Sequence, residues 1–151
     1  MEVATLLHDA GFDEELTAVG LLHDAVERGT ATETGLRAEM GGGISSLVMA
    51  LTEDRSLASF AERKEALRDQ VRAAGPRAIA VFAADKLSDI RGLQRGIGTS
   101  RESIEARMGT TIAAMAGHYG ESVLMIEASD PSSCFVPALR RELASLTTPA
   151  E

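Results

Sequence analysis

A chain of 151 residues is long enough for one ordinary domain with its own core and too short for two. Hydrophobic residues make up 44% and charged residues 25%, which is typical of a globular protein rather than a disordered one. The formal net charge of −8 argues against a surface that tracks nucleic-acid phosphates, but a small anionic substrate stays compatible if a metal ion and local basic residues offset that charge.

No stretch of the chain approaches the length of an apolar membrane span, and its first residues lack the basic start of a signal peptide. Cys134 is the only cysteine, so no internal disulfide can form and a reducing compartment is the simpler expectation. We therefore expect a cytoplasmic protein with no membrane and no nucleic-acid partner.

Apolar residues recur at helical spacing along almost the whole chain, and no segment alternates with a sustained period of two. We therefore predict an all-α fold, a compact bundle in a single domain over residues 1–151. Asp13 is placed to cap the second helix, and Pro76 stands where the first position of the sixth would be. About eight helices are predicted, over residues 1–10, 13–28, 33–41, 44–51, 60–74, 77–93, 100–129 and 137–146, with a loop at 96–100.

The first candidate site is a His-Asp pair inside an apolar run, in the segment LLHDAVE that includes His23, Asp24 and Glu27. On a helix these three residues are three and four positions apart, so they can face one cavity. Imidazole and carboxylate together suit Mn, Fe or Zn better than a cage of oxygen ligands alone, and Glu27 is placed to orient a water or accept its proton. The alternative is a buried histidine bonded to a neighbouring carboxylate, but the LLHDAVE setting favours the metal site.

The second candidate site follows an unusually apolar stretch at residues 78–84 and contains Asp85, Lys86 and Asp89. A carboxylate at the end of such a stretch either pairs with a base such as Lys86 or binds a cation. Asp89 lies one helical turn further on, on the face of Asp85. Taken alone, this cluster is compatible with a solvated ion-pair face or with a site.

In this order, these residues resemble the HD superfamily of metal-dependent phosphohydrolases, and more narrowly the small RelA/SpoT-type hydrolases of guanosine tetraphosphate. Each piece is weak alone, but five pieces at matching intervals are strong evidence for the family, whose fold is all-helical. The matching pieces are EVATLLHDAGFDEELTAVGLLHDAVE, ISSLVMALTED, ERKEALRDQV, AVFAADKLSDIRGL and HYGESVLMIE.

The resemblance implies His23, Asp24 and Asp85 as ligands of Mn²⁺ or another divalent transition metal. It also implies Glu27 as the acid that activates water, and it places Asp89 at a second catalytic position. In the family a Mn²⁺ ion polarises the 3′-diphosphate, water attacks, and pyrophosphate leaves.

For the substrate, the resemblance implies contacts from Lys64 to the phosphates and from Tyr119 near the nucleotide. We also expect Lys86 and Arg28 at substrate-binding positions, where Arg28 could pair with a substrate phosphate or with Asp24. The alternative for Lys64 is one charge among many on an exposed helix face. Tyr119 sits on an apolar stripe, so its alternative is packing with the hydroxyl at the rim.

Four departures from the family pattern bear on activity. The first family ligand, a His in an HPxxVAxxL context, would fall upstream of Met1, so we expect the domain to lack the family's first helix and that ligand, together with the basic segment beside it. Arg28 stands where the family has the Asp of HDxxED, and Asp89 replaces the Asn of ADKLxN. Three ligands can still hold a metal ion, with water completing the coordination.

Two functions from different classes follow. The first is a metal-dependent hydrolase of guanosine tetraphosphate or a similar 3′-phosphorylated nucleotide. The second is a degenerate HD domain that binds a nucleotide or a protein partner without catalysis. A hydrolase of an unrelated phosphoester is a third reading, because one scaffold hosts many substrates. An apolar face left by a missing first helix would favour a homo-oligomer.

Overall fold

The computed structural model describes residues 1–97 and 100–147, and within these ranges every regular element is an α-helix. The all-α prediction is confirmed, with nine helices in the described part of the chain rather than about eight. They are α1 (Glu2–Asp9), α2 (Glu14–Leu22), α3 (Glu33–Met40), α4 (Gly42–Ala50), α5 (Phe60–Ala74), α6 (Pro76–Ile97), α7 (Arg101–Met108), α8 (Ile112–Ser129) and α9 (Val136–Thr147).

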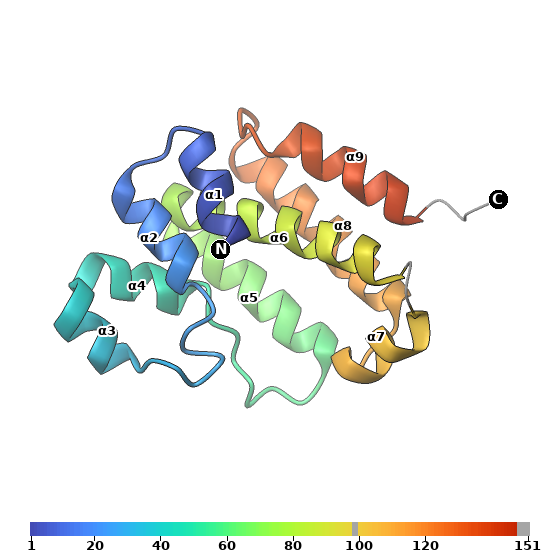
Figure 1. The fold of residues 1–151 in the computed structure, drawn as a ribbon, viewed down its shortest axis with the longest axis horizontal. Helices are drawn as coiled ribbons and strands as arrows, with labels where there is room; N and C mark the ends of the chain where they lie inside the picture. Colours follow the sequence, from blue (N-terminus) through green and yellow to red (C-terminus); the bar gives the residue numbers. More distant parts are fainter. Residues whose placement is uncertain (98–99, 148–151) are drawn as a thin grey trace.

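Helix α6 forms the centre of the molecule (Figure 1). Its apolar stretch at residues 78–84 is buried on every side, since each of these seven residues is at most 9% exposed. A helix that is hydrophobic all round must be covered on all sides, and α6 contacts every other described helix except α3. The two clusters named above therefore sit on or against the most buried helix.

The other helices surround α6 in groups (Figure 1). Helices α1 and α2 pack against each other and against α6, while α3 and α4 form a hairpin in which α4 contacts α2, α5 and α6. Helices α5 and α8 lie along α6, and α9 covers α6 and α8. None of the described helices combines the length and apolar character needed to cross a membrane.

The second helix ends six residues earlier than predicted, at Leu22 instead of Arg28, and turns follow as far as Gly29. The side chain of His23 gives a physical reason. Its Nδ1 donates to the carbonyl oxygen of Gly20 at 2.8 Å, and a continuing helix would need that oxygen for the amide of Asp24. The metal-ligand candidates therefore lie in a turn rather than on a helix face.

The helix predicted over residues 100–129 is two helices, which accounts for the additional element. Gly109 adopts a left-handed conformation with φ of 64° and ends α7, and Thr111 then caps α8 by accepting a hydrogen bond from the amide of Ala114. The apolar spacing of the sequence continues from α7 into α8, so it does not indicate that the helix is interrupted. Of the predicted loop at 96–100, Gly98 and Thr99 lie outside the described residues.

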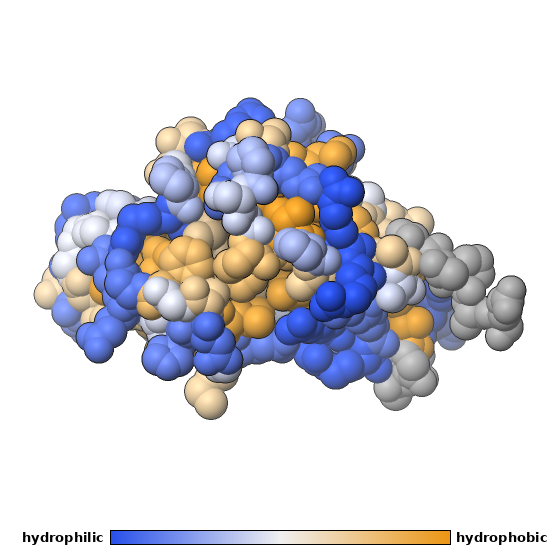
Figure 2. All heavy atoms as spheres, turned by 90° about the horizontal axis from the view of Figure 1, so that it is seen from above, coloured by the Kyte–Doolittle hydropathy of each residue, from blue (hydrophilic) through white to orange (hydrophobic). Residues whose placement is uncertain are grey.

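One face of the molecule is partly apolar. Figure 2 looks down on the side where α1 and α9 lie, and hydrophobic residues gather in the middle of this face with hydrophilic residues around them. Two large hydrophobic side chains on the described surface, Leu21 and Leu124, are 52% and 60% exposed.

Candidate active site

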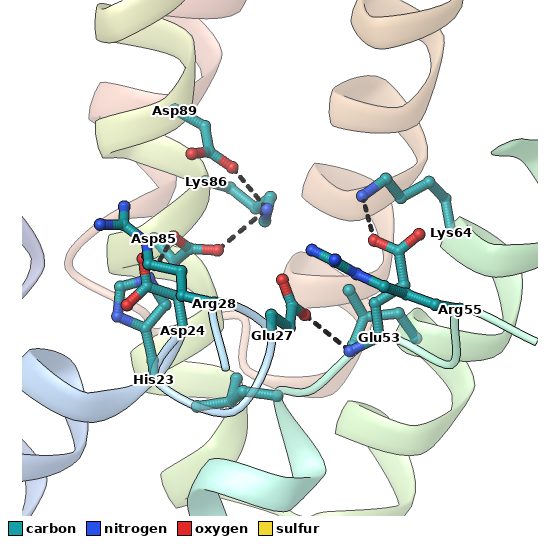
Figure 3. A pocket seen from close by; sticks show the side chains of 12 residues that line it. His23, Asp24, Glu27, Arg28, Glu53, Arg55, Lys64, Asp85, Lys86 and Asp89 are labelled. Carbon is teal, nitrogen blue, oxygen red and sulfur yellow. Dashed lines mark hydrogen bonds and ion pairs between the residues drawn. The ribbon is translucent and has the colours of Figure 1, made fainter. Parts of the chain in front are cut away.

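Four segments that are far apart in the sequence line one cavity of about 280 Å³, called here the main cavity. They are the turn after α2, the loop after α4, α5 and α6 (Figure 3). Eight of the nine residues selected from the sequence lie on its walls: His23, Asp24, Glu27, Arg28, Lys64, Asp85, Lys86 and Asp89. The ninth, Tyr119, lies outside it.

His23 and Asp85 join the turn to α6. His23 Nε2 lies 3.0 Å from Asp85 Oδ1, and both side chains are 18% exposed. Although burial opposes it, the hydrogen bond to Asp85 and its charge raise the pKa of His23 to about 9. With Nδ1 held by the Gly20 carbonyl, Nε2 is the ring nitrogen directed at the carboxylate.

Lys86 lies between two carboxylates of its own helix. Its Nζ is 2.9 Å from Asp85 Oδ2 and 2.6 Å from Asp89 Oδ2, and its side chain is 7% exposed. Despite burial, the two carboxylates raise the pKa of Lys86, which stays charged. Burial and the neighbouring charge of Asp85 raise the pKa of the Asp89 carboxyl. The Lys86 ammonium thus lies between Asp85 and Asp89 and neutralises part of the negative charge that a bound cation would otherwise neutralise.

The turn after α2 contributes two further contacts. Arg28 Nε lies 2.5 Å from Asp24 Oδ2, with the Arg28 side chain 73% exposed and that of Asp24 29% exposed. Glu27 points into the main cavity, and its Oε1 accepts a hydrogen bond of 2.6 Å from the amide of Glu53 (Figure 3). The turn and the loop after α4 are therefore tied together across the cavity.

Glu53 was not selected from the sequence, although the piece ISSLVMALTED contains it. Its two carboxylate oxygens bind Arg63 Nε and Lys64 Nζ, each at 2.7 Å, and its side chain is 12% exposed. These two bases lower the pKa of Glu53 in spite of burial. Lys64 is only 20% exposed and faces the main cavity, so the alternative of an exposed helix face does not describe it. Arg55, from the same loop, adds a further cation to the wall.

A smaller cavity of about 70 Å³, called here the inner recess, shares Lys64, Lys86 and Asp89 with the main cavity. Tyr119 lines this recess and is 6% exposed, while burial and the charge of Asp89 raise the pKa of its hydroxyl. His118 lines it as well and is also 6% exposed. His118 was not selected from the sequence either, although the piece HYGESVLMIE begins with it.

The described residues contain no group of three His, Cys, Asp or Glu side chains close enough together to hold a metal ion. The predicted ligands are neighbours, but each is engaged with a side chain of the protein. Asp24 is bonded to Arg28, and Asp85 is bonded to both His23 and Lys86. Metal binding would therefore require these pairs to separate.

Comparison with known proteins identifies relatives. The HD domain family model matches residues 1–121. The human guanosine-3′,5′-bis(diphosphate) 3′-pyrophosphohydrolase MESH1 is 35% identical over 91 residues, which cover 60% of this chain and 50% of the human protein. The GTP pyrophosphokinase rsh of Brucella abortus is 33% identical over 129 residues, and this chain spans 17% of its length.

Two solved structures have a similar fold. The structure of lmo0812 from Listeria monocytogenes EGD-e matches with a TM-score of 0.83 and 29% identity, and the match covers 96% of each chain. A metazoan ortholog of SpoT, described as hydrolysing ppGpp, matches with a TM-score of 0.76 and 23% identity over 97% of this chain and 78% of its own.

Proposed function

The chain belongs to the HD domain family, as its sequence motifs predicted, and from this premise we propose that it is a metal-dependent hydrolase of guanosine 3′,5′-bis(diphosphate) or a closely similar nucleotide. The reaction is attack of water on the 3′-diphosphate with release of pyrophosphate. MESH1 carries this activity in its name, and the Brucella relatives are much longer proteins, so the substrate is proposed from the shared domain.

One observation carries the proposal: the turn after α2 and the end of the apolar stretch of α6 meet at His23 and Asp85, whose side-chain atoms are 3.0 Å apart. These residues are 62 positions apart in the sequence, and the fold brings their imidazole and carboxylate together in a cavity that four basic residues also line. A helical scaffold that joins such donors next to phosphate-binding cations suits phosphoester hydrolysis.

The donor chemistry fits a divalent transition metal. The Nδ1–H of His23 is held by a backbone carbonyl, the arrangement that orients a metal-binding imidazole and leaves Nε2 to coordinate. We propose that His23, Asp24 and Asp85 hold the ion, with Mn²⁺ as the candidate from the family. When bound, such an ion supplies Lewis-acid polarisation of a phosphoryl oxygen.

The side chains of the cavity have separate roles in this proposal. Glu27, fixed by the amide of Glu53, accepts a proton from the attacking water through its free oxygen. Lys64 and Arg55 bind the phosphates. The charge of Lys86 offsets that of Asp85 and Asp89, which would otherwise repel the phosphates. Asp89 orients the Lys86 ammonium.

A degenerate HD domain that binds a nucleotide without hydrolysis is the second candidate. The Arg28–Asp24 ion pair favours it, because a metal ligand is engaged by a cation of the chain itself. This reading expects little affinity for metal. Nucleotide binding without metal-dependent release of pyrophosphate would support it over the enzyme.

The deciding experiment measures pyrophosphate release from guanosine 3′,5′-bis(diphosphate) with and without Mn²⁺, for the wild type and Asp85→Ala. We expect metal-dependent release that falls by more than about a hundredfold in Asp85→Ala, since a ligand is lost. Asp69→Ala is the matched control, because Asp69 is an exposed aspartate paired with Arg72 on α5. Unchanged turnover in Asp85→Ala would contradict the proposal.

The partner is then a small phosphorylated nucleotide, and the compartment we propose is the cytoplasm, where Cys134 stays reduced. Homo-oligomer formation remains a prediction that the apolar area on the α1 and α9 side supports. Light scattering on the full chain tests it, and a mass of 15.9 kDa across the concentration range would contradict it.

A further inference from the structure

The inner recess contains a hydrogen-bond donor that has no partner. Nε2 of His118 is buried and bonds to no other atom in the described part of the chain. The residue is 6% exposed and lines the recess. A buried donor without an acceptor is unfavourable and rare in folded proteins, so its presence beside a cavity points to a binding partner.

The position of the His118 proton follows from its neighbour. Arg68 Nη1 lies 2.8 Å from His118 Nδ1, and a guanidinium group can only donate. Nδ1 therefore accepts, and the proton of the neutral ring is on Nε2. Burial and the charges of Lys86, Lys64 and Arg68 lower the pKa of His118 to about 2, so the ring stays neutral near pH 7. Arg68 thus fixes an N–H donor at the wall of the recess.

The charges around the recess select what kind of group fits there. Both ammonium groups at its mouth are already paired, since Lys64 binds Glu53 and Lys86 binds Asp85 and Asp89. Because each ammonium group is already held by a carboxylate, a second phosphate that entered the recess would have to separate one of these ion pairs. The remaining walls are two aromatic rings and two thioether side chains: Phe60, Tyr119, Met108 and Met115. An uncharged ring with an acceptor atom suits such walls.

We propose that His118 contacts the substrate, donating its Nε2–H to an acceptor atom on the uncharged sugar–base part of a nucleotide whose phosphates lie in the main cavity. This inference rests on the proposed function and adds the orientation of the ligand. The nucleoside points from Lys64 and Lys86 towards α8, and Arg68 acts as a positioning residue that holds the His118 ring. Asp89, at the mouth, can accept from a hydroxyl of the same group.

The test compares binding of three probes to the full chain by calorimetry: guanosine 5′-diphosphate, ribose 5-phosphate and pyrophosphate. His118→Leu removes the donor, and His118→Gln is the matched variant because its amide can both accept from Arg68 and donate into the recess. We expect His118→Leu to weaken guanosine diphosphate binding about threefold to tenfold, the range for one hydrogen bond to a neutral group. The affinity of His118→Leu for pyrophosphate should stay within twofold of the wild-type value. His118→Gln should bind guanosine diphosphate with most of the wild-type affinity.

Binding of ribose 5-phosphate shows whether the atom that accepts from His118 belongs to the sugar or to the base. Weaker binding of this probe to His118→Leu assigns the contact to the sugar, and unchanged binding together with weaker guanosine diphosphate binding assigns it to the base. In the wild type, the ring N–H signal of His118 in a ¹⁵N-labelled sample should arise from Nε2. It should shift with guanosine diphosphate and not with pyrophosphate.

Equal weakening of guanosine diphosphate and pyrophosphate binding would overturn the inference, and so would unchanged binding in His118→Leu or a His118 signal that does not respond to the nucleotide. The proposed function fails independently of this result. A wild type that binds guanosine diphosphate through His118 but releases no pyrophosphate would refute hydrolysis and leave the contact intact. A wild type that does not bind guanosine diphosphate would refute the contact.

Discussion

Arg28 is the residue at which the charge of the main cavity departs most from the family pattern, since a base replaces an acid. The structure pairs its Nε with Asp24 at 2.5 Å. The pair is largely exposed on the Arg28 side, and exposed ion pairs contribute little to stability. The main consequence of this pair is therefore competition, because Arg28 and a metal ion would bind the same carboxylate, that of Asp24.

We predict that Arg28→Gln raises the affinity for Mn²⁺ about twofold to fivefold, because the free energy of one exposed ion pair no longer opposes binding. A binding isotherm on the full chain measures this change. Arg37→Gln is the matched control, since Arg37 also forms an i,i+4 pair, with Glu33, far from the cavity. Equal or weaker Mn²⁺ binding by Arg28→Gln would show that Arg28 does not compete.

His118 predicts a pH dependence of stability. Its pKa is about 2 in the folded protein and about 6.5 when unfolded, so below pH 6.5 the unfolded chain binds a proton that the native state does not. The free energy of unfolding therefore falls as the pH falls through this window. Burial lowers this pKa most, the charges of Lys86 on α6 and of Lys64 and Arg68 on α5 lower it further, and the charge of Asp85 on α6 raises it.

Between pH 7.5 and 5.5 we expect the wild type to lose about 1.4 kcal/mol more stability than His118→Leu. Urea denaturation followed by circular dichroism at the two pH values measures the difference. Parallel losses in both proteins would mean that the ring is not held neutral in the native state.

At the scale of the elements, the break between α7 and α8 depends on Gly109. Its φ of 64° is costly for any residue with a Cβ, although a Cβ there would meet no atom within 4 Å. We predict that Gly109→Ala lowers the free energy of unfolding by about 1 kcal/mol through backbone strain alone. Denaturant unfolding measures it.

Gly117 provides the opposite case on α8. It is exposed and helical, and a Cβ there also meets nothing within 4 Å. Gly117→Ala should raise stability by about 0.5–1 kcal/mol, because alanine favours the helix. The two substitutions add the same methyl group, so a shared sign would contradict the argument from backbone conformation.

Helices were predictable from the sequence because their apolar spacing and caps are local, and α5 spans the predicted residues 60–74. The ends at Leu22 and Gly109 were not, because both lie inside continuous apolar patterns. After Leu22 the His23 side chain donates a hydrogen bond to a backbone carbonyl that a longer helix would need, and Gly109 adopts a left-handed backbone conformation. Neither event alters hydrophobic periodicity, so periodicity cannot detect it.

The same distinction holds for the site. His23 and Asp85 were identified because they carry a motif, and the structure brings them together. Glu53 and His118 were missed, because their importance depends on contacts with residues 11 and 50 positions away, Lys64 and Arg68. Such contacts follow from how α5 packs against α8 and the loop after α4, which no local pattern encodes.

At the scale of the whole molecule, α6 joins the core to the cavity. We predict that Phe82→Ala lowers the free energy of unfolding by about 3–5 kcal/mol, since Phe82 is 1% exposed and its loss leaves a cavity. Because α6 contacts seven other helices, unfolding should remain a single cooperative transition with a lower midpoint. Urea denaturation followed by circular dichroism and by tyrosine fluorescence measures both the free energy of unfolding and the cooperativity of the transition.

Leu124→Ala is the control, because Leu124 is 60% exposed on α8 and its truncation should change stability by less than about 0.5 kcal/mol. A biphasic transition in Phe82→Ala would mean that the helices around α6 unfold as independent groups. A cost below about 1 kcal/mol would mean that the core collapses around the missing ring.

The central position of α6 also sets the order in which the protein can mature during synthesis. Every residue that lines the main cavity precedes residue 90, yet the apolar stretch at 78–84 stays partly uncovered until α8 and α9 have left the ribosome. At about 5–20 residues per second, the remaining residues take several seconds to add. The nascent chain therefore carries all of its proposed catalytic groups several seconds before the helices that complete the core around α6 can pack.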